Sequence, residues 1–112
     1  MRSPILIAMT NPVSAERDAD FNRWYDEVHA SDILAVPGML SISRYRAVEQ
    51  IQREPGPPQY RYLAVYEMAG PTDPVAAFKA ARPGFRLSDA VGAPSLAVSY
   101  VPIFSVRKGD TK

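Results

Sequence analysis

The hydrophobic and polar positions divide the chain into short segments of two kinds. Residues 5–9 form a continuous apolar run that is short and rich in β-branched side chains, which is typical of a buried strand. Residues 39–48, 60–68 and 95–106 combine alternating positions with aromatic and β-branched side chains, and they are also predicted to be strands. The segment between residues 49 and 59 is rich in proline and has no apolar periodicity, so it is predicted to be a loop.

The segment that follows the first strand has helical periodicity. Ser14 is a suitable N-cap, and the pattern continues from there to about His29. Residues at helical spacing form one stripe: Phe21, Trp24, Tyr25, Val28 and Asp32. Asp32 is the polar member of this stripe. A second short turn over residues 31–36 is expected to restart at Ser31 and to stop before Pro37-Gly38.

A second helix is predicted after the third strand. Thr72 or Asp73 can cap it, and Pro74 suits its first position because proline lacks the N–H that a helix start leaves unpaired. Strong helix formers follow until Pro83-Gly84 ends the segment. The predicted order of elements is therefore β-α-β-β-α-β. This is the split βαβ arrangement of the ferredoxin-like α+β class, a four-stranded antiparallel sheet with both helices on one face.

The predicted strands are apolar on both of their faces. Residues 62–66 are apolar or aromatic in both alternating phases, and the last strand is similar. An antiparallel sheet with one face in water alternates apolar and polar positions instead. The 112 residues are expected to form one domain, residues 1–112, with no segment left to cover the second face. We therefore expect a homodimer in which two sheets pack face to face.

Composition narrows the class of protein. Thirteen Lys and Arg residues against twelve Asp and Glu give a net charge of +1, and the charges are interleaved, so neither nucleic acid nor a membrane surface is an expected partner. The absence of cysteine excludes disulfides, thiolate zinc sites and a cysteine nucleophile. The apolar run of residues 4–9 is too short for a signal peptide core or a membrane span, so a cytoplasmic protein is expected.

Eleven prolines are about twice the usual share, and most of them fall between the predicted elements. Pro102 is the exception, because it lies inside the predicted strand of residues 95–106. Proline cannot donate a ladder hydrogen bond, so this position indicates an edge, a bulge or a crossing into the partner.

Several motifs occur in an order that resembles a known family. They are Phe21-Asn22-Arg23-Trp24-Tyr25-Asp26-Glu27-Val28-His29, Pro37-Gly38-Met39, Ser43-Arg44-Tyr45 and Tyr62-Leu63-Ala64-Val65-Tyr66-Glu67. Together they resemble the EthD-like branch of the dimeric α+β barrel superfamily over residues 3–106. The resemblance implies two ferredoxin-like protomers whose sheets close into a barrel, with a pocket between sheet and helices in each. Members of that superfamily include monooxygenases, polyketide cyclases, isomerases, lyases and haem enzymes.

His29 is the first candidate catalytic residue, because it is the sole histidine and imidazole exchanges protons near neutral pH. A histidine of this helix acts as acid or base in cofactor-free members of the family, and the resemblance implies the same for His29. The alternative is a histidine favoured near a helix C-terminus by the helix dipole. Asp26, one turn earlier, either orients the imidazole or is a solvent-exposed acid.

Arg44 and Tyr66 complete the candidate catalytic set. Arg44 stands in a strand, where it can stabilise a carboxylate or enolate oxygen or pair with Glu67 of the neighbouring strand. Tyr66 is expected to place its hydroxyl in the pocket, with packing as the alternative. The candidate substrate-binding residues, for which packing or solvent exposure is again the alternative, are Tyr25, Asn22, Tyr100 and Trp24.

No G-x-G-x-x-G, P-loop or G-x-S-x-G motif is present, and one histidine without cysteine does not predict a metal site. The sequence thus favours a small cofactor-independent enzyme that uses acid/base chemistry on a small aromatic, polyketide-like or lactone compound. Its reaction type would be that of an isomerase, cyclase, lyase or monooxygenase. Two alternatives remain open: a haem-binding protein with His29 as the axial ligand, and a non-catalytic dimer that binds a small molecule or serves as an accessory subunit.

Overall fold

The computed structural model describes residues 2–50 and 58–110, so the centre of the predicted loop, residues 51–57, lies outside the described residues. The strands are β1 (Ile5–Thr10), β2 (Met39–Arg46), β3 (Tyr62–Met68) and β4 (Leu96–Tyr100). The helical segments are η1 (Ala15–Arg17), α1 (Asp18–Trp24), η2 (Tyr25–His29), α2 (Ala30–Leu34), α3 (Pro74–Ala81) and η3 (Arg82–Gly84).

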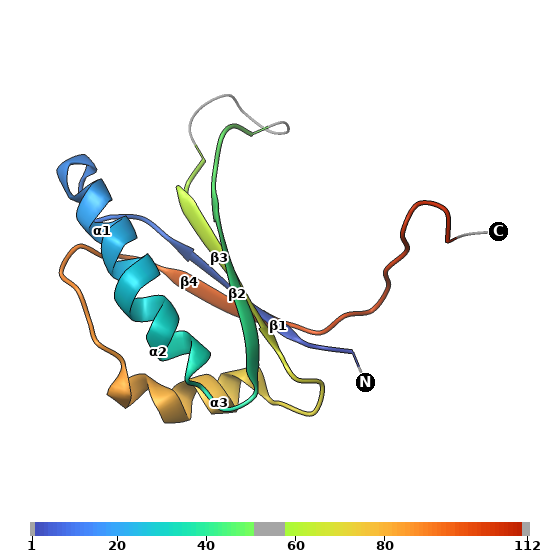
Figure 1. Cartoon of the computed structure of the whole chain (residues 1–112). Helices are drawn as coiled ribbons and strands as arrows, with labels where there is room; N and C mark the ends of the chain where they lie inside the picture. Colours follow the sequence, from blue (N-terminus) through green and yellow to red (C-terminus); the bar gives the residue numbers. More distant parts are fainter. Residues whose placement is uncertain (1, 51–57, 111–112) are drawn as a thin grey trace.

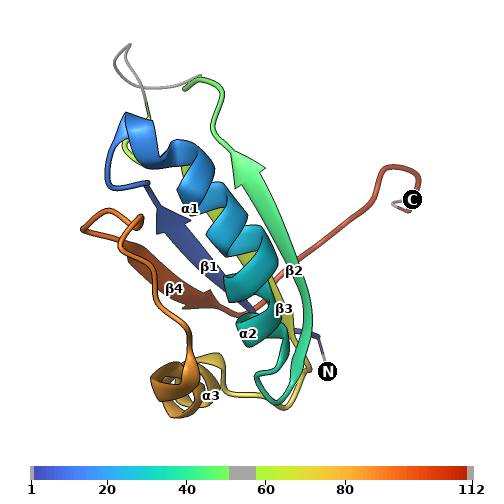
Figure 2. The same ribbon diagram turned by 60° about the vertical axis from the view of Figure 1, so that its left-hand side comes forward.

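The strands form one antiparallel sheet in the order β2-β3-β1-β4, so β1 and β3 are central. The helices α1 and α2 run across one face of this sheet, and α3 lies at one end of the same layer (Figures 1 and 2). The order and topology confirm the predicted ferredoxin-like α+β class.

The core lies between the sheet and the helical layer. Its largest fully buried side chains come from both layers: Phe21, Ile33, Tyr66 and Met68. Alternate residues of β3 point toward the helices, as the period of two in a strand requires. Phe21 of α1 packs on Tyr62 of β3, with ring centroids 5.4 Å apart. Complete burial of an aromatic side chain is among the largest single contributions to stability, and Phe21 anchors the helix to the sheet.

The helical segment of residues 15–34 is continuous, which corrects the expected restart at Ser31. Its middle turn, η2, is a π-helical turn in which the backbone N–H of Ala30 donates to the carbonyl of Tyr25. The turn holds one residue more than an α-helical turn and joins α1 to α2 without a break. At the other helix, Asp73 caps α3 as predicted, and its carboxylate accepts from the backbone N–H groups of Val75 and Ala76.

Strand β4 ends at Tyr100, so the prediction of a strand over residues 95–106 was wrong in its second half. Tyr100 is opposite Ile5, the first residue of β1, and no residue of β1 remains to pair with the chain beyond it. Pro102 also lacks an N–H for a ladder bond. Residues 101–110 instead extend away from the sheet as an exposed arm (Figure 1).

The face of the sheet opposite the helices is mainly apolar, with Ser43 of the edge strand β2 as the polar member of its rows. Ser43, Val65, Ile7 and Val98 are aligned in one row across the four strands. The neighbouring row is Tyr45, Leu63, Met9 and Leu96. Nothing in the described residues covers this face, and the arm adds exposed apolar side chains such as Ile103, which is 91% exposed. We call these two rows together the outer face.

Candidate functional site

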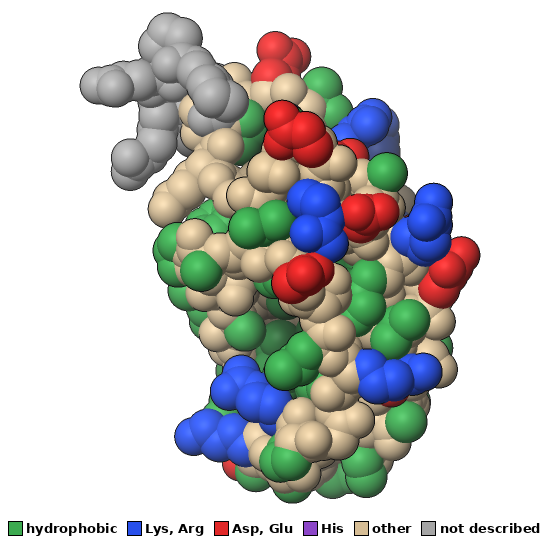
Figure 3. Space-filling model, turned by 90° about the vertical axis from the view of Figure 1, so that its left-hand side faces the viewer, with side chains coloured by type: hydrophobic (Ala, Val, Ile, Leu, Met, Phe, Trp, Pro, Cys, Tyr) green, Lys and Arg blue, Asp and Glu red, His purple; other side chains and the backbone are tan. Residues whose placement is uncertain are grey.

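A cavity of about 350 Å³ lies between the helical layer, the sheet and the segment that follows α3. Figure 3 shows a hollow in this side of the molecule, with hydrophobic side chains at its floor and Lys and Arg side chains along one rim. Its lining is mainly apolar and aromatic, and it comprises Ala8, Thr10, Phe21, Trp24, Tyr25, His29, Tyr66, Phe78, Arg82, Phe85, Leu87, Ser88, Val91, Ser95, Leu96 and Ala97. A mainly apolar wall with few polar groups is typical of small-molecule sites.

His29 lies in this cavity at the end of the π-helical turn, enclosed by three aromatic rings. Its imidazole is stacked on Trp24, and the edges of Tyr25 and Phe85 meet it with ring centroids 4.8 and 5.6 Å away. The turn places Tyr25 and His29 on the same wall. Single π-helical turns inside helices are frequent at functional sites, because the extra residue redirects the side chains that follow.

The hydrogen-bonding capacity of His29 is not used up by the protein. Its Nδ1 is buried and has no hydrogen-bond partner among the described residues. Burial lowers the pKa of His29 to about 4, the carboxylate of Asp32 opposes this shift, and the charge of Arg44 adds to it. The imidazole is therefore uncharged at neutral pH, and its Nδ1 is neither exposed to solvent nor hydrogen-bonded within the described residues.

Tyr25 and Tyr66 form a buried pair beside His29. Their hydroxyl groups are hydrogen-bonded to each other, and burial raises the pKa of both. Two hydroxyls carry two protons, and their mutual bond uses one of them. The hydroxyl that accepts in this bond keeps a proton that it can donate to a ligand. Of the predicted site residues, four line this one cavity, namely Trp24, Tyr25, His29 and Tyr66.

Arg44 and Asn22 do not line this cavity, and the structure places them on the other side of Tyr25. The Arg44 guanidinium donates to Asp26 at 2.6 Å and to Asn22 at 2.9 Å, and it lies 4.2 Å from the centroid of the Tyr25 ring. The pairing of Arg44 with Glu67, one of its two predicted roles, is thus wrong, and the other, contact with a substrate oxygen, finds Arg44 outside the cavity lining. Asp26 is occupied by Arg44 and does not orient the imidazole. Arg44 acts on the cavity through Tyr25, as a positive charge behind the ring.

Tyr100 is the remaining predicted site residue, and it lies apart from the cavity. It pairs with Ile5, while its neighbour Ser99 pairs with the helix-facing Leu6. Side chains alternate along a strand, so Tyr100 belongs to the side of the sheet opposite the helices, where it is 49% exposed. The structure does not bring it to His29.

Asp32 and Arg86, to which the sequence analysis gave no role in the site, hold the cavity wall in place. The carboxylate of Asp32 accepts from the backbone N–H of Arg86 at 2.8 Å and from its guanidinium at 2.9 Å. The indole Nε1 of Trp24 donates to the carbonyl of Arg86 at 3.1 Å. These bonds fix the segment that carries Phe85 and Leu87. The signal for Asp32 was its position as the one polar member of an apolar stripe.

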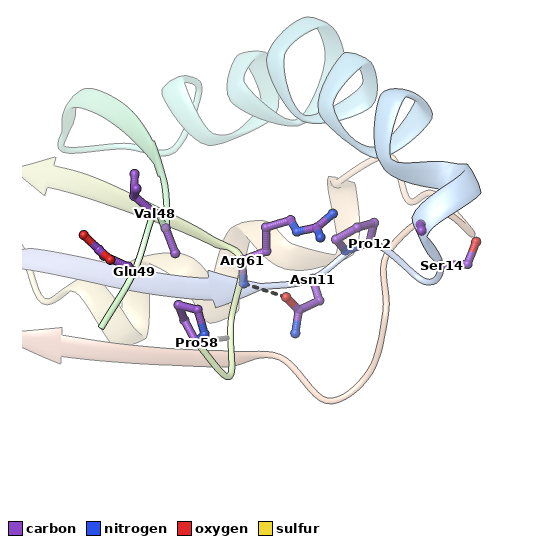
Figure 4. Close-up of a pocket in the computed structure, with 9 residues that line it drawn as sticks. Asn11, Pro12, Ser14, Val48, Glu49, Pro58 and Arg61 are labelled. Carbon is purple, nitrogen blue, oxygen red and sulfur yellow. Dashed lines mark hydrogen bonds between the residues drawn. The ribbon is translucent and has the colours of Figure 1, made fainter. Parts of the chain in front are cut away.

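Another hollow, of about 450 Å³, lies where β1 ends and β3 begins (Figure 4). The side chain of Asn11 accepts from the backbone N–H of Arg61 at 2.6 Å and donates to the carbonyl of Gln59 at 3.0 Å. These bonds tie the two strand ends together. Both polar atoms of the Asn11 carboxamide are hydrogen-bonded to the backbone, so Asn11 holds the strand ends together and is not a candidate ligand-binding residue.

The residues around His29 do not fit a haem. The imidazole is stacked on Trp24, the rings of Tyr25 and Phe85 pack perpendicular to it, and its Nδ1 is buried, so these rings occupy the space that an axial ligand leaves for the macrocycle. Within residues 2–50 and 58–110, no group of three His, Asp or Glu side chains is placed to hold a metal ion. Over the same residues, no helix has the length and apolar character needed to cross a bilayer.

Solved structures of the same fold support the assignment of the architecture. A candidate monooxygenase from Shewanella loihica PV-4 aligns with a TM-score of 0.62 and 16% identity, over 93% of this chain and 97% of that one. A DABB family protein with a ferredoxin-like fold from Mesorhizobium loti aligns with a TM-score of 0.57, 16% identity and coverage of 92% and 100%. An EthD family protein from Bacillus halodurans C-125 aligns with a TM-score of 0.56, at the same identity and coverage.

At such identities the likeness shows the fold, which is the one that the EthD-like resemblance implied. No protein-family model matches the sequence, and no curated protein matches it either.

Proposed function

We propose that this protein is a cofactor-independent enzyme in which His29 takes a proton from, or returns it to, a carbon beside a carbonyl or phenol of a small aromatic, polyketide-like or lactone substrate. The observation that carries the proposal is the place of His29 in the lining of the apolar cavity, where burial keeps its imidazole uncharged at neutral pH. Isomerisation, cyclisation, elimination and reaction with oxygen can all begin with such a proton transfer. The monooxygenase and EthD names of the structural neighbours agree with this class of chemistry.

The apolar cavity favours proton transfer in two ways. The imidazole is held uncharged at neutral pH by burial, so it is free to accept a proton. As the carbon loses its proton, negative charge develops on the substrate oxygen beside the new imidazolium. This charge raises the proton affinity of His29, because opposite charges attract strongly where water is excluded.

The tyrosine pair supplies the donor for the developing oxyanion. Tyr25 and Tyr66 keep their protons at neutral pH, because burial raises the pKa of both. The proton left over from their mutual bond is available to the substrate oxygen, which strengthens this contact as it becomes anionic. Arg44 stabilises the same charge from behind the Tyr25 ring without touching the substrate.

The functional unit in this proposal is a homodimer that covers the outer face. Partly exposed apolar rows of this extent mark an interaction surface, and a second copy offers the same surface in return. The exposed arm of residues 101–110 extends beyond the edge of the sheet, where a partner would stand (Figure 1). A non-catalytic dimer that binds a small molecule has the same outer face, so the catalytic step needs its own test.

That test uses 2-tetralone, an uncharged aromatic ketone whose C1 protons are activated by the carbonyl. In deuterium oxide at neutral pH, the protein is expected to accelerate the replacement of these protons by deuterium, followed by proton NMR. His29→Gln is expected to reduce the acceleration by about 10²-fold or more, and Tyr66→Phe by a smaller factor. Glu27→Gln, an exposed change near the end of the same helical segment, is the control.

An exchange rate equal to that of buffer would overturn the proposal. A His29→Gln variant that keeps both the circular dichroism spectrum and the full activity of the unaltered protein would overturn it as well.

A further inference from the structure

Arg82 lies at the rim of the cavity and has no ion-pair partner among the described residues. It follows α3, and it lines the cavity with Phe78 and Phe85. Its guanidinium lies 5.8 Å from the centroid of the Phe78 ring, at the distance of a cation–π contact. Phe78 in turn packs on Phe85 at 5.2 Å, and Phe85 on His29 at 5.6 Å. A continuous aromatic wall therefore joins the guanidinium to the imidazole.

The neighbouring arginines differ from Arg82 in how their charge is used. Arg86 is paired with Asp32, and Arg17 is paired with Asp20 and Asp89. Arg82 is the one permanently charged side chain in the cavity lining, and that lining holds no Asp or Glu. The cavity thus joins an apolar interior to a single cation whose five N–H donors are not taken by a carboxylate in the described part of the chain.

We infer that the cavity takes an aromatic carboxylate, with its carboxyl group on Arg82 and its ring against Phe78 and Phe85. A guanidinium matches a carboxylate with two parallel hydrogen bonds, which are stronger than bonds between neutral groups. The aromatic wall supplies stacking surface for a ring between the two polar ends. A volume of about 350 Å³ suits a ligand of one or two fused rings. This inference rests on the proposed function, since it names the substrate class of the same site.

The matched probes are 2-naphthoate and 2-naphthamide, which share shape and ring system and differ in charge. Affinity is measured by calorimetry for each. The place of binding is read from the indole N–H signal in nitrogen-15 NMR spectra, because Trp24 is the one tryptophan of the chain and lines the cavity. We expect 2-naphthoate to bind about tenfold more tightly than 2-naphthamide and to shift the Trp24 signal.

Three variants isolate the contribution of Arg82. Arg82→Gln should bring the two affinities to within about twofold while leaving that of 2-naphthamide unchanged. Arg82→Lys should keep part of the preference, because the positive charge remains while the two parallel N–H donors of the guanidinium are lost. Lys79→Gln removes an exposed cation of α3, the helix just before Arg82. Lys79 does not line the cavity, so this variant should keep the full preference for 2-naphthoate.

The inference is overturned if the probes bind equally, if the preference survives in Arg82→Gln, or if Lys79→Gln abolishes it equally. Failure of 2-naphthoate to saturate the protein or to move the Trp24 signal overturns it as well. These measurements are binding equilibria and need no turnover. The exchange test with uncharged 2-tetralone does not involve a carboxylate, so failure of the proposed chemistry and failure of the carboxylate site are distinguished.

Discussion

The imidazole of His29 is stacked on the indole of Trp24, with ring centroids 4.6 Å apart and planes inclined by 19°. The indole is held by its hydrogen bond to the carbonyl of Arg86, and Arg86 is held by Asp32. The position of the imidazole therefore depends on a bond between the helical segment and a segment more than fifty residues away. A change in the segment that contains Arg86 is therefore expected to move the imidazole of His29 through Trp24.

Asp32→Asn should loosen that wall. The change removes the charge that binds the Arg86 guanidinium and weakens the bond to its backbone N–H, which should lower the free energy of unfolding. The side chain of Asp32 is 14% exposed, so water replaces the lost bonds poorly. Urea denaturation measures the loss, and hydrogen exchange of residues 85–91 should become faster. Asp20→Asn, at a more exposed ion pair, is the control. Unchanged exchange in that segment would contradict this role.

His29 should make stability depend on pH in a defined window. Its pKa is about 4 in the folded protein, against 6.5 in an unfolded chain, so the unfolded state binds more protons between these values. Stability contributed by neutral His29 is full above about pH 6.5 and is lost as the pH falls toward 4. The loss should be on the order of 2 kcal/mol, after allowance for partial exposure. Burial causes the shift, Asp32 opposes it and Arg44 adds to it.

The comparison of the unaltered protein with His29→Gln isolates this contribution from that of the carboxylates. Urea midpoints between pH 4 and 7 should fall more steeply for the unaltered protein. Parallel curves for the two proteins would show that His29 does not titrate with a lowered pKa.

The hydroxyls of Tyr25 and Tyr66 should be strongly coupled. Replacing either tyrosine by phenylalanine leaves the other hydroxyl buried without its partner, which should cost about 1–3 kcal/mol. Replacing both removes the pair together, so the double variant should lose less than the sum of the single losses. A double-mutant cycle in urea measures this difference. Additive losses would show that the two hydroxyls do not depend on each other.

Charged substitutions on the outer face should dissociate the proposed dimer. Val65→Lys places an ammonium group beside Ile7 on the outer face, where a partner sheet would bury it. Light scattering coupled to size exclusion should then report a monomer at concentrations where the unaltered protein is a dimer. Val75→Lys, an exposed apolar position on α3, is the control and should leave the dimer intact. A chain that ends at Tyr100 tests the arm and should dissociate more readily.

A monomeric unaltered protein at high concentration would exclude the dimer. So would a Val65→Lys variant that stays dimeric.

Local chemistry in the sequence was sufficient to predict the order of elements. Pro74 after Asp73 begins α3, Pro37-Gly38 ends the α2 region, and periods of two and of about 3.6 distinguish strands from helices. Each of these signals depends on residues a few positions apart, so each can be recognised without knowing the fold. The same helical spacing places Phe21, Trp24 and Tyr25 on one face, whereas the π-helical turn brings His29 rather than Val28 to the cavity wall.

The site depended on contacts that no local pattern contains. The sequence left Arg44 with a substrate oxygen or Glu67 as its partner. In the sheet Arg44 is opposite the buried Ala64, so it faces the helical layer, where η2 supplies Asp26, whereas Glu67 belongs to the other side of the sheet. The register of β4 against β1 places Tyr100 on the side of the sheet opposite the helices. Because Ile5, the partner of Tyr100, is the first residue of β1, β4 ends at Tyr100.

The sequence by itself determined which elements form and which aromatic residues share a helix face, because backbone preferences and periodicity act over short distances. The tertiary structure alone decided the π-helical turn at His29, the Asp32–Arg86 bond and the place of Arg82 beside Phe78. Of these, the Asp32–Arg86 bond arises from packing between residues 54 positions apart in the chain, and no local pattern contains it. Burial in that packing is also what lowers the pKa of His29 and leaves its Nδ1 without a partner in the described residues.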